Sequence, residues 1–134
     1  MKNALLLIGF LIMGFAVRSQ QAEVLTTAEQ MPVFPGGEEG LKEYLIKNIK
    51  YPDEAVQKAV EGVSYVTFVV SSTGEVTGAQ ILRGANEQLN QEALRVVNSM
   101  PHWQPAMKDG HAVSVKYTLP IRFSLDVADK KNGR

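Results

Sequence analysis

The two histidines, His102 and His111, are the first candidates for chemistry, and they stand nine residues apart in loop-like segments. A hydrolytic metal site places two histidines at a helical spacing such as i and i+4, with a carboxylate close by. This pair has neither feature. The chain also has no cysteine, which excludes thiol catalysis and thiolate metal ligands. We expect two exposed histidines and no metal, with a hydrolase that uses either one as the alternative.

Other catalytic patterns are also missing from the sequence. No serine stands in a Gly-x-Ser-x-Gly turn, and no glycine-rich segment is followed by the Lys-Ser/Thr pair of a phosphate-binding loop. The acidic pairs Glu38-Glu39 and Asp53-Glu54 lie where helices are predicted to begin. Neighbouring helical residues do not face each other, so favourable interaction with the helix dipole explains these acids better than paired catalysis. We predict a binding protein with no enzymatic activity and no cofactor.

The charge balance and the N-terminus limit the possible partners and location. The chain has 14 basic and 14 acidic residues, so it lacks the positive charge on which general nucleic-acid binding depends. Lys2 precedes the apolar run 4–17, a pattern typical of an export signal. As a helix this run would extend about 21 Å, short of a hydrocarbon core of ~30 Å. We interpret residues 1–19 as a signal peptide, with a short retained anchor as the alternative.

The rest of the chain is predicted to form one domain. Residues 20–30 form a polar tether, 31–126 the domain, and 127–134 a charged, mobile tail. At its start, prolines and glycines surround Val33 and Phe34, which predicts an extended arm that packs both apolar side chains before turning.

Two helices are predicted next. In the first, at about 38–49, apolar residues recur at helical spacing. Pro52 begins the second, because proline fits the first helical turn. We expect this helix to run to Val60 and Gly62 to supply the left-handed residue that ends it.

A hairpin follows. Val63–Val70 is rich in β-branched and aromatic residues, which predicts a strand. Ser71–Gly74 is a turn, and Glu75–Leu82 returns as the second strand. Gly78 and Gly84 weaken that strand or mark a bulge.

A third helix is predicted with Asn90 as its N-cap, and Leu89 packing on Leu94 as a hydrophobic staple. Pro101 ends it. Trp103 follows between two prolines, and we expect its ring in the core, with an interface anchor as the alternative.

The last strand, Val113–Leu125, alternates apolar and polar residues and therefore has one dry and one wet face. Its 13 residues would span about 43 Å. Pro120 has no N–H group, so we place this strand at a sheet edge with that position facing outward. An edge strand invites another chain to pair with it, although Lys116 and Arg122 equally suit an edge protected against pairing.

The predicted order is helix, helix, strand, strand, helix, strand. This order favours an α+β fold in which an antiparallel three-stranded sheet carries helices packed on one face.

Six segments in this order resemble the C-terminal domain of TonB-type energy transducers, and the resemblance runs from about residue 31 to 125. The opening further resembles the version found in Bacteroides-like bacteria. The segments are Met31-Pro-Val-Phe-Pro-Gly-Gly-Glu, Tyr51-Pro52-Asp-Glu-Ala, Gly62-Val-Ser-Tyr-Val-Thr-Phe-Val-Val, Leu89-Asn-Gln-Glu-Ala-Leu-Arg-Val-Val, Met100-Pro-His-Trp-Gln-Pro-Ala and Tyr117-Thr-Leu-Pro-Ile-Arg-Phe.

The resemblance implies a periplasmic domain that serves energy-dependent transport. Domains of this family bind the N-terminal box peptide of TonB-dependent outer-membrane transporters, which adds as a strand beside the last strand. In such strand addition, backbone hydrogen bonds supply affinity and flanking side chains supply selectivity. The partner-binding residues implied here are Val113, Val115, Lys116, Tyr117, Thr118, Leu119, Ile121, Arg122 and Phe123, with Tyr51 and Pro52 in a region linked to transporter contact.

The chain departs from a full transducer of this family at its N-terminus. Such a transducer has a longer, histidine-containing anchor that couples to inner-membrane motor proteins, followed by a long proline-rich spacer. Residues 1–19 contain no histidine, and residues 20–30 reach at most about 40 Å. A retained N-terminal segment would still allow contact with motor proteins. The alternatives are a stand-alone periplasmic module with another exported partner and a strand-paired homodimer.

Overall fold

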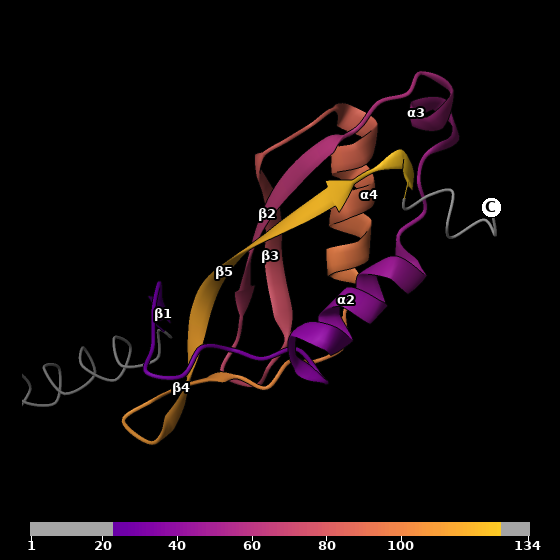
Figure 1. Ribbon diagram of the computed structural model, residues 1–134. Helices are drawn as coiled ribbons and strands as arrows, with labels where there is room; N and C mark the ends of the chain where they lie inside the picture. Colours follow the sequence, from indigo (N-terminus) through magenta and orange to yellow (C-terminus); the bar gives the residue numbers. More distant parts are fainter. Residues whose placement is uncertain (1–22, 127–134) are drawn as a thin grey trace, which may run out of the picture.

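The structure, a computed structural model, describes residues 23–126 (Figure 1). The predicted signal peptide, the first residues of the tether and the predicted tail at 127–134 lie outside the described residues. In chain order the elements are β1 (Val24–Leu25), α2 (Gly37–Asn48), α3 (Asp53–Gln57), β2 (Gly62–Val70), β3 (Val76–Arg83), α4 (Glu87–Asn98), β4 (Ala106–Lys108) and β5 (His111–Phe123).

The predicted antiparallel strands form the centre of the sheet. β2 pairs antiparallel with β3 on one side, and with β5 on the other from Gly62↔Phe123 to Val70↔Val115. Two short strands are added to this centre, so the expectation of three antiparallel strands is corrected to a mixed, five-stranded sheet. β1 runs parallel to β5, and β4 forms a hairpin with it. The α+β class itself is confirmed.

The helices α2 and α4 lie on one face of the sheet (Figure 1). Leu89, Ala93 and Val97 of α4 pack into a single core with alternate residues of β2 and β5. Successive strand residues point to opposite faces of a sheet, so the residues between these core positions point to the other face. Within residues 23–126 no helix covers that face (Figure 1). The buried core residues that the three elements share are Val66, Phe68, Val70, Leu89, Ala93, Val97, Leu119, Ile121 and Phe123.

The alternation predicted for the last strand is confirmed in β5. Its odd residues from Val115 onward are buried or half-buried, whereas Lys116, Thr118, Pro120 and Arg122 are exposed. Ser114 breaks the pattern, because it is buried and its Oγ accepts a hydrogen bond from the Ser72 amide at 3.1 Å.

Two predicted helix ends are wrong. α4 begins one turn earlier than expected, because Asn86 is its N-cap and accepts from the Leu89 amide at 2.9 Å. The Asn90 side chain instead accepts from Ser64 Oγ at 2.8 Å, an interaction between helix and strand that no local pattern reveals. The second helix already ends at Gln57.

Past that helix end, the left-handed residue is Ala59, with φ 54°, rather than Gly62. A left-handed alanine is strained locally, and the turn is held by hydrogen bonds from the Ala59 and Val60 amides to the Val56 and Ala55 carbonyls, at 3.1 and 2.8 Å. The predicted bulge in the second strand is confirmed, since Gly78 has φ 64° within a shift of the β2–β3 register.

Trp103 lies in the core as expected, with 3% of its surface exposed. Its ring contacts Phe34, Phe68 and Tyr117, with centroid separations of 5.5, 5.6 and 5.2 Å. The arm before α2 supplies Phe34, as predicted, but Val33 remains 43% exposed, which corrects the expectation that both side chains pack. The arm is held by its backbone instead, through bridges from Gln30 and Val33 to residues 107 and 104.

Candidate partner-binding edge

The outer edge of β5 is open over part of its length. β2 pairs with one edge of β5 up to Val115, and β1 pairs at Ser114 and Val115. Since Val115 pairs with both strands, β1 must lie on the edge opposite β2. From Lys116 to Phe123, no strand within residues 23–126 pairs on that opposite edge. The predicted edge strand is therefore partly covered, and about 26 Å of it stays available.

The side chains implied as partner-binding divide into two groups. Val115, Leu119, Ile121 and Phe123 are buried, so at these positions only the backbone is accessible to a partner. Val113 and Tyr117 are half-buried. The exposed members, whose side chains lie on the face without helices, are Lys116, Thr118 and Arg122.

That helix-free face has a defined neighbourhood around β5. Tyr65 of β2 lies at its middle, between Pro120 of β5 and Arg83 of β3. The Arg83 guanidinium carbon lies 4.4 Å from the centroid of the Tyr65 ring, a cation–π contact. Tyr65 and Arg83 could not be predicted as neighbours from the sequence, because each has an ordinary strand pattern around it and only strand register brings them together.

Tyr51 and Pro52 lie at the Phe123 end of the open edge. The Tyr51 ring packs edge-on against Phe123, with centroids 5.8 Å apart, and its hydroxyl donates to the Val60 carbonyl. Burial, with a smaller contribution from Glu61, raises the pKa of Tyr51, so the hydroxyl remains a donor at neutral pH. This tyrosine thus holds the end of β5 in place, and Pro52 directly precedes α3.

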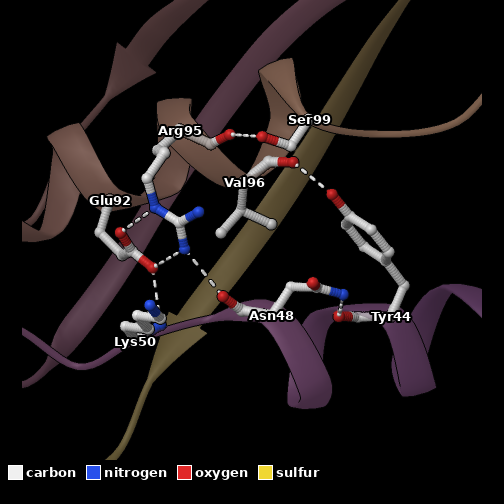
Figure 2. Close-up of polar contacts among 7 residues, drawn as sticks. All are labelled: Tyr44, Asn48, Lys50, Glu92, Arg95, Val96 and Ser99. Atoms are coloured by element: carbon white, nitrogen blue, oxygen red, sulfur yellow. Dashed lines mark hydrogen bonds and ion pairs between the residues drawn. The ribbon is translucent and has the colours of Figure 1, made fainter.

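A polar cluster joins the segment before Tyr51 to α4 (Figure 2). The Tyr44 hydroxyl donates to the Val96 carbonyl at 2.8 Å, and the Arg95 guanidinium donates to the Asn48 carbonyl at 2.8 Å. The Glu92 carboxylate accepts from the Lys50 amide at 2.6 Å. These contacts hold the end of α2 against α4 and so fix the position of the segment that leads into Tyr51.

Glu92 is ionised at the centre of this cluster. Burial alone would raise its pKa, but hydrogen bonds from Arg95 and from the Lys50 amide outweigh burial and hold the pKa below its ordinary value of 4.5. Arg95 approaches both carboxylate oxygens, with 2.7 Å from Nε to Oε1 and from an Nη to Oε2. The paired charges explain how a side chain only 10% exposed remains ionised.

The rest of the described chain offers little for chemistry. Within residues 23–126 there is no group of three or more potential metal ligands. The side chains of His102 and His111 are exposed, as predicted. No helix in the same range is long and apolar enough to cross a membrane.

The model of the family "Gram-negative bacterial TonB protein C-terminal" matches residues 47–125. The similar solved structures include two NMR solution structures of the Helicobacter pylori TonB C-terminal domain. The form comprising residues 194–285 is 24% identical, with a TM-score of 0.50, over 65% of this chain and 91% of that chain. The longer form, residues 179–285, is also 24% identical, with a TM-score of 0.46, over 63% and 76%. No curated protein matches.

The matched segment covers more than half of the chain, and the chain belongs to the TonB C-terminal domain family. This is a non-enzymatic, transport-related family of the cell envelope that takes part in TonB-dependent energy transduction. Its domains generally interact with outer-membrane transporters. The similarity to the Helicobacter domain supports the same α+β fold.

Proposed function

We propose that this protein is a periplasmic TonB-like module whose strand β5 pairs with the N-terminal box peptide of an outer-membrane transporter. The observation that carries the proposal is the open outer edge of β5 from Lys116 to Phe123. Membership of the family supports the class of partner. In the proposal, residues 1–19 export the chain, or remain as an anchor in contact with inner-membrane motor proteins.

The proposed binding mode is β-augmentation. Unpaired N–H and C=O groups of β5 bond to the backbone of the incoming peptide, and side chains beside it select among sequences. Eight residues of open edge match the length of a short extended peptide. Val115 and Val113 lie where β1 already pairs or adjoins, so the peptide occupies mainly the part of the edge beyond β1.

A second proline in β5 tests the proposal. Backbone groups two residues apart point to the same edge of a strand. Pro120 pairs with Tyr65 within an unbroken β2–β5 register. Proline has no N–H group to donate to β2, so we expect its nitrogen to point toward the open edge. The Thr118 amide, two residues away, should then point toward the open edge as well. We expect Thr118→Pro to weaken binding of transporter-derived peptides about tenfold or more, since each lost backbone bond costs about 1 kcal/mol and the ring blocks close approach.

The measurement is an NMR titration of the protein with peptides from the N-termini of the same organism's outer-membrane transporters, with affinity from the shifts of the β5 amides. Thr118→Val is the matched control, because it keeps the amide and should bind like the parent. Undiminished binding by a folded Thr118→Pro variant, or shifts confined to other elements, would refute strand addition at this edge.

A further inference from the structure

The paired region of the sheet's helix-free face carries three cations and, at its two ends, adjoins Glu61 and Glu75. Lys116 and Arg122 stand on β5, at the two ends of the open edge, and Arg83 stands on β3. Strand register places no carboxylate among the residues paired across this face. These residues are Val63, Tyr65, Thr67 and Val69 of β2, Thr77, Gln80 and Arg83 of β3, and Lys116, Thr118, Pro120 and Arg122 of β5.

The two cations of β5 have no acidic partner among residues 23–126. The ion pairs in that range are Lys58–Glu54 and Arg95–Glu92, both away from β5. Glu61 is the acid just beyond the Arg122 end of the ladder, and its carboxylate accepts from the Leu125 amide at 2.8 Å. Neither cation forms an ion pair within residues 23–126, so the charge of each is available to a residue on an added strand.

Lys116 and Arg122 each have β2 on one side and the open edge of β5 on the other. Across β2, Lys116 pairs with Val69 and Arg122 pairs with Val63, and neither valine can balance the charge. On the other side lies the open edge. A residue on an added strand would have its Cβ about 5 Å from that of its β5 neighbour, close enough for an ion pair.

We infer that the strand accepted by β5 carries acidic side chains on its helix-free face, opposite Lys116 and Arg122 and therefore six residues apart. This inference rests on the proposed function and adds a rule of partner selection to it. Opposite charges across a strand pair favour association, whereas like charges disfavour it. Cationic strands are thus rejected at the same two positions at which acidic ones are favoured, so the selection works in both directions.

Three synthetic peptides test the inference directly. The first has the core Glu-Val-Thr-Val-Thr-Val-Glu, with Gly-Ser extensions for solubility, and the other two carry Gln or Lys in place of both Glu. We expect the parent protein to bind the Glu peptide about two- to fivefold tighter per charge than the Gln peptide, and the Lys peptide weakest. Low salt should widen the differences, since exposed charges are screened.

A charge swap in the protein provides the stronger test. The double variant Lys116→Glu/Arg122→Glu should reverse the order and prefer the Lys peptide. Lys42→Glu is the matched control, because Lys42 is exposed on α2 in the helix layer and its reversal changes net charge without touching the edge. This control should keep the parent's preference. If the double variant does not fold, the three-peptide comparison on the parent decides alone.

The outcomes separate the two proposals. Peptides that bind the β5 amides with equal affinity whatever their charge would overturn the acidic-strand rule and leave strand addition intact. An equal loss in the Lys42→Glu control would also overturn it, since general attraction would then explain the preference. No shift of the β5 amides with any peptide would overturn both the inference and the proposed function.

Discussion

Glu92 is the residue whose ionisation bears most directly on stability. Its carboxylate is nearly buried, accepts from the Lys50 amide and from Arg95, and joins α4 to the segment that leads into Tyr51. The hydrogen bonds that stabilise the charged form of Glu92 exist only in the folded state. Its folded-state pKa is therefore depressed below 4.5, and stability from this group is present above that pH and lost as the pH falls through the depressed value.

We expect Glu92→Gln to lower the free energy of unfolding at pH 7 by about 1–2 kcal/mol, because an amide cannot replace a carboxylate that accepts from a guanidinium and a backbone N–H. The difference from the parent should shrink as the pH falls below 4.5. Urea unfolding between pH 7 and pH 3.5 measures this. Glu43→Gln, at an exposed position on α2, is the control and should show neither effect. A pH-independent difference would refute the ionised role.

At the scale of elements, the β2–β3 turn is joined to the segment that carries Trp103. The Trp103 amide donates to the Gly74 carbonyl at 2.8 Å. Gly74 has φ 90°, and a Cβ added there would lie 2.0 Å from the Trp103 carbonyl oxygen. Gly74 is therefore required both for its positive φ and because the Trp103 carbonyl, far along the chain, leaves no room for a Cβ.

Gly74→Ala should therefore be costlier than a glycine replacement that meets strain alone. Gly110, in the turn between β4 and β5, has φ 76° and nothing within 4 Å of an added Cβ. We expect Gly110→Ala to cost about 1–2 kcal/mol from left-handed strain, and Gly74→Ala to cost about 3 kcal/mol or more, because the backbone at Trp103 must also move. Parallel urea unfolding curves measure both. Equal costs would show that the contact at Trp103 relaxes freely.

At the scale of the whole molecule, the charges of β5 bear on self-association. Two copies that paired antiparallel through their open edges, centred on Leu119, would place Lys116 of one copy opposite Arg122 of the other at both ends. Like charges in that position are destabilising, and charged edges are a common protection against edge-to-edge pairing. The same residues that favour an acidic strand thus disfavour a second copy.

We accordingly expect the protein to sediment as a monomer, and Lys116→Thr/Arg122→Thr to self-associate more strongly, by about two- to fivefold per opposed pair removed. Sedimentation velocity over a range of concentrations measures this. Lys42→Thr removes a charge from the helix layer and is the control. Dimerisation of the parent at concentrations where the neutral variant remains a monomer would refute this protective role and favour a homodimer through another surface.

Much of the fold could be predicted because local periodicity reports burial. The helix at α2, the hairpin of β2 and β3, and the alternation in β5 follow from side chains that must face a core or water. The buried position of Trp103 was predicted on other grounds, from the size of its ring and its place between two prolines after a helix end. Of the proposed binding edge, the sequence indicated the last strand. Pro120, which has no N–H group, indicated that part of this strand lies at an edge of the sheet.

The rest depended on residues far apart in the chain. Asn90 looked like a cap by composition, but the cap is Asn86, and Asn90 bonds to Ser64 across the fold. β1 could not be predicted, because two residues carry no periodicity and pair only where β5 offers an edge. The sequence by itself determined which residues of β5 face inward. Only the tertiary structure decided which part of its edge stays open within residues 23–126 and that Lys116 and Arg122 form no ion pair in that range, because register and pairing are properties of several strands together.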